Sequence, residues 1–484
     1  MMMTFAPTHP RLAALIWALA LISGGLLALA YSNNPAWWAA WLAPAPALAA
    51  VLLTPPKWRR HVGLAVGLLA GMLSFNYRVE TGSLMAAVVI AAAYAFGWSS
   101  TLRLAASVAE RWGAITAAFV LPAAWAAIDT LLNQLSPHGS MGSLAYSQGD
   151  MLPAFQLASL GGVSAVTFLI LLPGSAAGLA MAQGFGGPAI RRLPQAAGLA
   201  LAVTAAALLF GTVRLSADPT PVGPEVAMIV ADTTASARRD WGQFVKTYGP
   251  ALDRAAQRGR TVLLPEAILR LDAAGLAPAT TALRSVARAR QATIIVGVVV
   301  DDGRVSTNRA LVFLPDGTSV TYLKQHLVPG IERDTTPGNR DLIIASPMVG
   351  TGIAICKDMH FPTLGRHYAT DGARLMLVPA NDFKVDDRMM MTVAAVRGIE
   401  GGYAVARAAR SGMSAMSDPY GRILAERRSD QTAGTLMTRA PAALAAPPLY
   451  ARVGDLFGWA CLFAWLGLSI GFKLQAARAR TVTE

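Results

Sequence analysis

The chain has 484 residues, of which 54% are hydrophobic and only 14% are charged, and its formal net charge is +13. This composition excludes an ordinary soluble enzyme, and the presence of only two cysteines excludes a disulfide-stabilised scaffold. The basic residues are scattered, without a basic helix or aromatic-basic interleaving, so we expect anionic lipid as their partner and no nucleic acid. Much of the chain is therefore predicted to lie in a membrane.

The first half of the chain is a series of apolar segments close to the ~20 residues that a membrane-spanning helix needs. We predict seven spans there and an eighth near the C-terminus: Leu12–Tyr31, Ala36–Leu53, Val62–Phe75, Leu84–Trp98, Trp112–Leu132, Leu157–Met181, Ala196–Val213 and Val453–Phe472. The first segment has an alternative as a cleaved signal peptide, since Ala28-Leu29-Ala30 resembles a cleavage site. Its long apolar core favours a retained helix.

Basic residues in the loops indicate the orientation. If the segments alternate, the short loops on one side carry only Arg78. The other side collects Arg11, Lys57, Arg59, Arg60, Arg103, Arg111, Arg191, Arg192, Lys473, Arg478 and Arg480. The positive-inside rule then places both termini in the cytoplasm and the large segment before the last span outside, which is the periplasm for a bacterial inner membrane.

Three parts follow from this pattern. We expect a transmembrane domain at residues 1–213, an extracytoplasmic domain at 214–452, and a C-terminal helix with a cytoplasmic tail at 453–484. The loop between the fifth and sixth spans, Asn133 to Gln156, lacks Lys and Arg and contains Tyr146 and Gln148. This polar loop is either a connector or a wall for a lipid headgroup.

The extracytoplasmic segment alternates short β-rich runs with helical ones, which predicts an α/β domain with helices covering the sheet. The predicted strands are Val226–Ala231, Thr261–Pro265, Thr293–Val300, Ala310–Leu314, Thr318–Lys324, Gly352–Ile355, Leu375–Pro379, Tyr403–Ala408, Ser414–Ser417 and Gly434–Thr438. The predicted helices are Gln243–Arg258, Thr280–Ala289, Pro362–Thr370 and Arg388–Gly398.

Three chemically capable residues stand at the ends of predicted strands. Cys356 follows an apolar run and precedes Phe361-Pro362, so we expect it on a strand-to-helix turn, where the pKa of a thiol can be lowered. An inert buried cysteine is the alternative. Glu266 and Lys324, each alone, are explained as solvated strand ends. Together with Cys356 they predict a carboxylate, an ammonium and a thiol at one edge of the sheet, where α/β proteins bind ligands.

These residues resemble, in the same chain order, the Glu-Lys-Cys triad of the nitrilase superfamily of carbon-nitrogen hydrolases. With seven spans before the domain and one after, the whole chain is similar to the bacterial apolipoprotein N-acyltransferases. The matching motifs are Leu264-Pro265-Glu266, Lys324-Gln325-His326-Leu327-Val328-Pro329, Leu144-Ala145-Tyr146-Ser147-Gln148 and Asn381-Asp382. Glu332 matches a second carboxylate of the family, and Trp241 a tryptophan. The resemblance implies an αββα sandwich for the extracytoplasmic domain.

The resemblance also implies an activity, in which an acyl chain passes from a membrane phospholipid to Cys356 as a thioester. The chain then passes to an amine, which in the family is the N-terminus of a diacylglyceryl-cysteine lipoprotein. The residues implied are Glu266, Lys324 and Cys356 as catalytic, Glu332, Lys357, Asp358, Asn381 and Asp382 as supporting, and Trp241, Tyr146 and Gln148 as substrate-binding. No cofactor is implied, and the six histidines show no metal-ligand spacing.

Two departures from the family leave the acceptor open. Lys357-Asp358 stands where the family has Tyr-Glu, and Phe383-Lys384-Val385-Asp386-Asp387-Arg388 stands where it usually has a Trp-Phe-Gly loop. The Lys357 side chain either favours the thiolate and meets an anionic substrate group, or points away in a structural role. The rival functions are a membrane-tethered amidase, a paralogue that acylates another amine, and a scaffold with a retired site, against which the intact Glu266, Lys324 and Cys356 argue.

Overall fold

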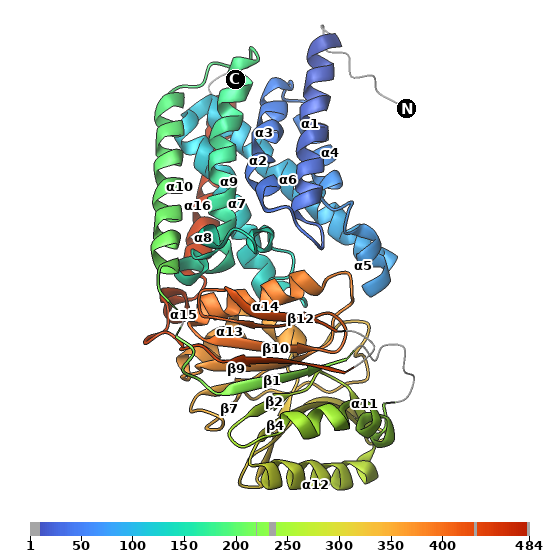
Figure 1. Ribbon diagram of the computed structural model, residues 1–484. Coiled ribbons are helices and arrows are strands. Elements are labelled where there is room, and N and C mark those ends of the chain that lie inside the picture. The colour runs from blue at the N-terminus through green and yellow to red at the C-terminus, as the bar shows by residue number, and fades with distance from the viewer. Residues whose placement is uncertain (1–9, 219, 232–238, 430–432, 482–484) are drawn as a thin grey trace.

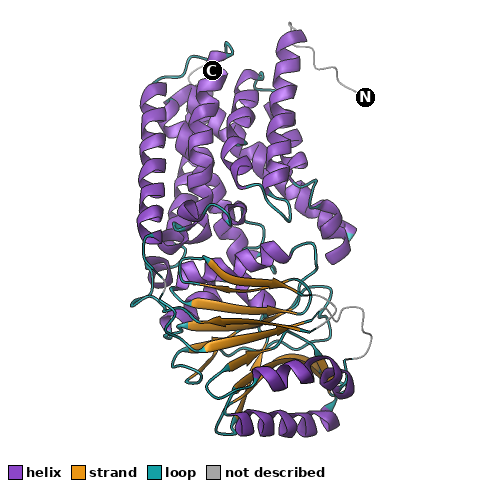
Figure 2. Ribbon diagram, viewed as in Figure 1, coloured by secondary structure: helices purple, strands orange, loops and turns teal. Residues whose placement is uncertain are grey.

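The protein consists of a helical bundle and an α/β sandwich stacked end to end. The computed structural model describes residues 10–218, 220–231, 239–429 and 433–481. Figure 1 shows the helices of the N-terminal half gathered at one end, with α16 from the far end of the chain running among them. The strands all lie in the other half, and helices cover both sides of the strand layers (Figure 2).

The bundle contains apolar helices of unequal length. They are α1 (Pro10–Ala30), α2 (Trp37–Leu42), α3 (Pro44–Leu53), α4 (Arg59–Ala70), α5 (Phe75–Thr81), α6 (Leu84–Trp112), α7 (Ala114–Leu135), η1 (Leu144–Gln148), α8 (Leu152–Phe155), α9 (Ala158–Gly184), α10 (Leu193–Leu215) and α16 (Leu456–Thr481). The interior of a long helix of this kind satisfies its backbone polar groups within the helix, as the bilayer core requires.

The helices of the bundle can be compared with the predicted membrane spans by length and composition. Within the described residues, five helices are long and apolar enough to cross a bilayer, namely α1, α6, α7, α9 and α10. The bent pair α4 and α5, which meet at 60°, makes a sixth if it counts as one span. The predicted second span corresponds to α2 and α3, which together make a shorter apolar helix, Trp37–Leu53, and the predicted eighth span corresponds to the apolar part of α16, Leu456–Gly471. The count of seven spans and an eighth stays a prediction.

Thirteen strands within the described residues form two sheets. Their bounds are β1 (Glu225–Val230), β2 (Thr261–Leu263), β3 (Leu269–Leu271), β4 (Thr293–Asp301), β5 (Ser306–Phe313), β6 (Ser319–Leu323), β7 (Leu342–Ile344), β8 (Thr351–Ile353), β9 (Leu375–Ala380), β10 (Ala404–Ala409), β11 (Met413–Ser417), β12 (Ile423–Arg428) and β13 (Gly434–Arg439). One sheet has the order β13-β1-β2-β4-β5-β6, with β3 also paired to β4, and the other has the order β12-β11-β10-β9-β8-β7.

The two sheets pack face to face between two helical layers. The outer face of the β1 sheet is covered by α11 (Trp241–Ala255) and α12 (Ala273–Arg290). The outer face of the β9 sheet is covered by α13 (Pro362–Thr370) and α14 (Asp387–Gly401), which separate it from the bundle; α15 (Leu449–Val453) leads into α16. A third apolar core, which includes Val226, Ile353 and Leu377, fills the space between the sheets. The predicted α/β nitrilase-like sandwich beside a helical membrane domain is therefore confirmed.

Most predicted strands and helices are present within a few residues of their expected bounds, and three strands were missed. β3 and β7 have three residues each, too few to show a period. β12 carries Glu426, Arg427 and Arg428, because an edge strand with one face in solvent tolerates charge. The domain boundaries after residues 213 and 452 stay a prediction; α10 extends to Leu215 and α15 begins at Leu449.

Candidate active site

The predicted catalytic residues come from the ends of strands in both sheets. Glu266 lies three residues beyond the end of β2, and Lys324 directly follows β6, both in the β1 sheet. Cys356 lies three residues beyond the end of β8 in the other sheet. A backbone hydrogen bond from Glu266 N to Ala380 O joins the two sheets at this end, at 3.2 Å. The expected single sheet edge is thus wrong, and the site lies where the ends of two packed sheets meet.

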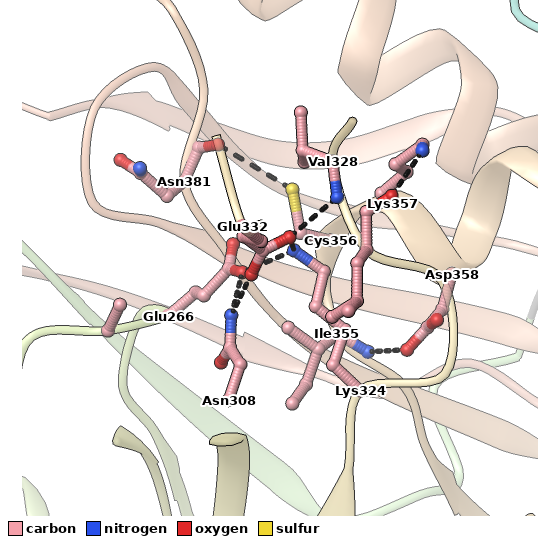
Figure 3. A network of polar contacts seen from close by, with 12 residues as sticks. Glu266, Asn308, Lys324, Val328, Glu332, Ile355, Cys356, Lys357, Asp358 and Asn381 are labelled. Atoms are coloured by element: carbon pink, nitrogen blue, oxygen red, sulfur yellow. Dashed lines mark hydrogen bonds and ion pairs between the residues drawn. The ribbon is translucent and has the colours of Figure 1, made fainter. Parts of the chain in front are cut away.

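Lys324 forms the centre of a buried polar cluster. Its Nζ donates to Glu266 Oε1 at 2.8 Å and to Glu332 Oε2 at 2.9 Å (Figure 3). Asn308, on β5, donates its amide Nδ2 to both carboxylates, at 2.7 Å to Glu266 Oε1 and 2.8 Å to Glu332 Oε1. The Val328 N–H adds a third donor to Glu332 at 2.7 Å. Two carboxylates therefore share one ammonium and one amide, which fixes all four side chains.

The charges of this cluster determine its protonation. Burial by itself would lower the pKa of Lys324, but the neighbouring Glu266, Cys356 and Glu332 outweigh burial and raise it above the usual lysine range. Lys324 is 2% exposed, so its positive charge is permanent and poorly screened by water. Such a cation is suited to stabilising negative charge that develops beside it.

A glycine allows the strand ends to come this close. Gly297 on β4 faces the turn that carries Glu266, and a Cβ atom there would lie 2.5 Å from Glu266 Cα. Any residue other than glycine would therefore displace the Glu266 turn. Ala267, the next residue, has φ +52°, a conformation that costs free energy for a residue with a side chain.

Cys356 lies on a sharp turn beside this cluster. It begins η2 (Cys356–His360) with φ +45°, a strained value for a non-glycine residue and one that is concentrated at functional sites. Its Sγ lies 3.5 Å from the carbonyl oxygen of Asn381, to which the thiol donates, and Figure 3 shows the sulfur next to Glu332 and the Lys324 ammonium. The side chain is partly accessible. The predicted strand-to-helix turn is present, with a short 3-10 turn before the helix α13.

The expectation of a lowered thiol pKa is wrong. Burial, followed by the negative charge of Glu266, raises the pKa of Cys356 above the normal cysteine value, although Lys324 and Arg407 act in the opposite direction. The position on a turn favoured a lowered pKa, but burial of the thiol outweighs that effect, and the charge of Glu266 adds to the rise. The group is therefore a neutral thiol at neutral pH and needs a base to become nucleophilic.

Lys357 points away from the thiol. Its Nζ donates to the carbonyl oxygens of Pro137, at 2.6 Å, and Leu327, at 2.5 Å. Burial and the nearby positive charge of Lys324 lower the pKa of Lys357 to about 8. Pro137 belongs to the loop after the membrane helix α7, so this side chain links the bundle to the loop after Lys324, in agreement with the structural alternative for Lys357.

Asp358 holds the turn and the Lys324 loop together. Its two carboxylate oxygens accept from the backbone N–H groups of Ile355, Gln325 and His326, from Tyr322 Oη at 2.8 Å, and from His326 Nδ1 at 3.1 Å. The residue is fully buried. This pattern of donors positions the residues on either side of Lys324 and Cys356.

Asn381 and Asp382 lie at the end of β9, beside the thiol. Asn381 contributes its backbone carbonyl to Cys356, and its side chain accepts from Arg410 Nε at 3.1 Å. Asp382 forms a buried bidentate ion pair with Arg407 of β10, in which Nη1 lies 2.8 Å from Oδ2. The ion pair joins the loop after β9 to strand β10, next to Asn381.

The three residues predicted to bind substrate are not part of the Lys324 cluster. Tyr146, on η1, bonds to Ser140 and accepts from Arg397 Nη2 at 3.1 Å, and it borders a cavity of ≈ 630 Å³ between the bundle and α14. Gln148 Oε1 accepts from Trp41 Nε1 at 2.8 Å, inside the bundle. Trp241 starts α11 and stacks on Phe244, with ring centroids 5.3 Å apart. Their contact with substrate stays a prediction.

Sequence reasoning missed several residues of the site. Asn308 lies inside β5, and Arg407 lies inside β10, where a buried charge needs a partner. That requirement was an available signal for Arg407, which interrupts the apolar run of β10, whereas Asn308 stands among polar residues and gave no such signal. Tyr77 and Asp386 were missed because they belong to opposite halves of the chain, yet Tyr77 Oη donates to Asp386 Oδ2 at 2.5 Å.

Comparison with known proteins agrees with this architecture. Residues 23–176 match the apolipoprotein N-acyltransferase N-terminal domain, and residues 246–446 match the carbon-nitrogen hydrolase family. Apolipoprotein N-acyltransferase of Geobacter metallireducens is 24% identical over 92% of this chain and 93% of its own length. That of Gloeobacter violaceus is 26% identical over 74% of this chain and 72% of its own length.

Two amidases match a smaller part of the chain. An (R)-stereoselective amidase of Pseudomonas is 28% identical over 30% of this chain and 56% of its own length. The solved structure of an amidase from Nesterenkonia has a TM-score of 0.41 at 20% identity, over 48% of this chain and 93% of its own.

The α/β sandwich is thus a carbon-nitrogen hydrolase domain attached to a membrane bundle. The chain is a divergent member of the apolipoprotein N-acyltransferase family, with both domains of that family in their usual order. Membership supports an acyltransferase function in a membrane, with lipid and lipoprotein substrates.

Proposed function

We propose that this protein is a membrane N-acyltransferase that carries an acyl chain on Cys356, as a thioester, from a phospholipid to an amine. The observation that carries the proposal is the grouping of Glu266, Lys324 and Cys356 at the junction of the two sheets. A base, a fixed cation and a thiol are what covalent acyl transfer requires. The family relationship supports the same chemistry.

In the first half-reaction, Glu266 takes the proton from the neutral thiol of Cys356 as the sulfur attacks the phospholipid ester carbonyl. Glu266 then returns that proton to the lysophospholipid oxygen as the C–O bond breaks. Lys324 stabilises the oxyanion of the tetrahedral intermediate, and the backbone N–H of Lys357 is a second donor. Loss of one such donor costs roughly 10²–10³ in rate. Glu332 and Asn308 hold Lys324 and Glu266 in place.

In the second half-reaction an amine attacks the thioester, and we propose the N-terminus of a diacylglyceryl-cysteine lipoprotein as that amine.

The proposal includes a bacterial inner membrane with the α/β domain in the periplasm and both termini in the cytoplasm. The positions of basic residues support this orientation. Arg59 pairs with Glu110, and Arg191 contacts Ala114, both at helix ends that face away from the α/β domain.

Mass spectrometry of the protein purified from native membranes tests the proposal. We expect a long-chain acyl group on Cys356, absent from Cys356→Ala, Glu266→Ala and Lys324→Ala. Addition of a diacylated lipopeptide should remove the adduct and produce a triacylated lipopeptide. A Cys356→Ala protein that still traps labelled acyl chain would contradict the assignment of Cys356. If the adduct is lost to water without peptide as fast as it is lost with peptide, the protein is a hydrolase.

A further inference from the structure

A residue of the membrane bundle reaches the loop that borders the thiol. Helix α5 departs from α4 at 60°. It places Tyr77 against the loop after β9, where its Oη donates to Asp386 Oδ2 and its ring meets the edge of Phe383, with centroids 6.4 Å apart. This loop starts at Asn381, whose carbonyl oxygen accepts from Cys356. The Asp386 carboxylate is therefore held against the bundle, on the loop that also contributes the Asn381 carbonyl beside the thiol.

Asp386 differs from the other acids around Cys356 in its partners. Glu266 and Glu332 share Lys324, and Asp382 pairs with Arg407. Asp387, the next residue, lies 2.7 Å from Arg428. In the described part of the chain, the partners of Asp386 are instead the neutral phenol of Tyr77 and the backbone N–H of Phe383, at 3.1 Å. One carboxylate of the site thus lacks a paired cation of its own.

This carboxylate is buried without full compensation. Asp386 is 1% exposed, and burial raises its pKa to about 7. The groups that face it are Tyr77 from α5, Asp382 from its own loop, and Arg407 from β10. The hydrogen bond from Tyr77 and the charge of Arg407 lower the pKa of Asp386, whereas the charge of Asp382 raises it. A buried anion of this kind gains free energy when a cation arrives beside it.

Exposed apolar side chains lie on the loop that carries Asp386 and on the two chain segments that flank helix α5. Val385 on the same loop is 59% exposed and Phe383 41%. Leu73, before α5, and Met85, at the start of α6, are 59% and 77% exposed. An ammonium group attached to a lipid anchor fits both features, because its charge meets the carboxylate while its chains remain among apolar groups.

We propose that Asp386, positioned by Tyr77, binds the ammonium of the acylated amine and takes its proton. This inference rests on the acyltransferase function proposed above. Asp386 removes one proton from R–NH₃⁺, and the nitrogen lone pair attacks the thioester carbonyl, so that a C–N bond forms and the C–S bond breaks. The second proton passes from nitrogen through Glu266 to the leaving sulfur. The proton on Asp386 leaves to water, and the products are the amide and the free thiol.

The test separates the two half-reactions in the full-length protein in phospholipid vesicles. The enzyme is loaded from a labelled phospholipid, and the loss of the Cys356 adduct is followed with a diacylated lipopeptide or with hydroxylamine, which is uncharged at neutral pH. Asp386→Asn should load as the wild type does and should lose the adduct to hydroxylamine normally. Its reaction with the lipopeptide should be slower by about 10²-fold or more, the usual contribution of a positioned base.

Asp387→Asn is the matched control, because it removes the adjacent carboxylate that already pairs with Arg428; both half-reactions should persist. If Asp386→Asn slows hydroxylamine and lipopeptide equally, or slows neither, the inference is wrong. A wild-type protein that never loads Cys356 contradicts the acyltransferase proposal instead.

Tyr77→Phe provides a second variant should Asp386→Asn not fold. Loss of the donated hydrogen bond destabilises the ionised carboxylate, so the pH midpoint of lipopeptide acylation should move upward. An unchanged midpoint overturns the inference.

Discussion

Asn308 is the residue whose side chain connects the two buried carboxylates of the site. Its amide donates to Glu266 and to Glu332. The two carboxylates also share the positive charge of Lys324, and Glu332 accepts from the Val328 N–H. The sequence around it, Ser306-Thr307-Asn308, resembles an ordinary strand start. Only the packing of β5 beside the Glu266 turn gives the amide its two partners.

Replacement of Asn308 by alanine should therefore weaken the site. Hydrogen bonds to charged groups are worth about 1.5–3 kcal/mol each, and a buried carboxylate left without its donor costs a similar amount. We expect the free energy of unfolding to fall by about this amount and thioester formation to slow. Asn308→Asp, which adds a third carboxylate of nearly the same shape, should be worse in both measurements. Equal stability of the three proteins would contradict this account.

The raised pKa of Asp386 has a consequence for stability. The folded protein holds a proton on this group up to a pH of about 7, whereas the unfolded chain releases it near the usual aspartate pKa of 3.8. Between these values the folded state binds more protons, so the contribution of Asp386 to stability is present at low pH and is lost as pH rises through 7. Asp386→Asn should gain stability relative to wild type as pH rises across this window. Denaturation at several pH values measures the difference, and a pH-independent difference would count against the prediction.

At the scale of elements, α14 and η2 join the two halves of the molecule. Val393, Val396 and Ile399 of α14 belong to the same apolar core as the membrane bundle, whereas Ala394 packs on the β9 sheet. Because both faces of α14 are covered, its pattern is that of a buried helix and not of an amphipathic surface helix. Next to it, Ser140 Oγ donates to His360 O at 2.8 Å, and Lys357 bonds to Pro137.

Lys357→Tyr, which restores the family residue, tests the role of this junction. A phenol can donate only one hydrogen bond, whereas the ammonium here donates two to buried carbonyls. We expect faster hydrogen exchange in residues 136–143 and a loss of about 1–3 kcal/mol in stability. Ser140→Ala, which removes the neighbouring link, should accelerate exchange in the same segment. Improved lipoprotein acylation with unchanged exchange would instead assign Lys357 to acceptor choice.

At the scale of the whole molecule, the α/β domain sits on one end of the bundle. Contacts at this end include Gln134 Nε2 to Asp455 Oδ2 at 2.9 Å and Gln156 Nε2 to Tyr420 O at 2.8 Å, besides Tyr77 to Asp386. The opposite end carries the basic loops. The site and the basic loops therefore lie at opposite ends of the bundle, and the proposed topology puts the site outside the cytoplasm.

Cysteine labelling tests this orientation. In a Cys356→Ser, Cys461→Ser background, exposed positions at the two ends are Ala189, in the loop before α10, and Arg304, in the turn after β4. A membrane-impermeant maleimide applied from the periplasmic side should label Arg304→Cys, and it should label Ala189→Cys only after the inner membrane is opened. The reverse pattern would contradict the proposed topology.

The sequence by itself determined the membrane bundle, the α/β class of the second half and the three residues at the strand ends. Apolar length, strand period and local motifs are properties of neighbouring residues, so they can be read along the chain. The number of spans stays a prediction, and the 60° bend between α4 and α5 is a feature that the apolar pattern did not show.

The tertiary structure alone decided the electrostatics and the wider site. The neutral state of Cys356, the double contact of Asn308 and the pairing of Tyr77 with Asp386 all depend on groups far apart in the sequence and close in space. A pKa follows from burial and from charges within a few ångströms, and sequence separation carries no information about either. For this reason the reactive groups were predictable, whereas their protonation and their partners were not.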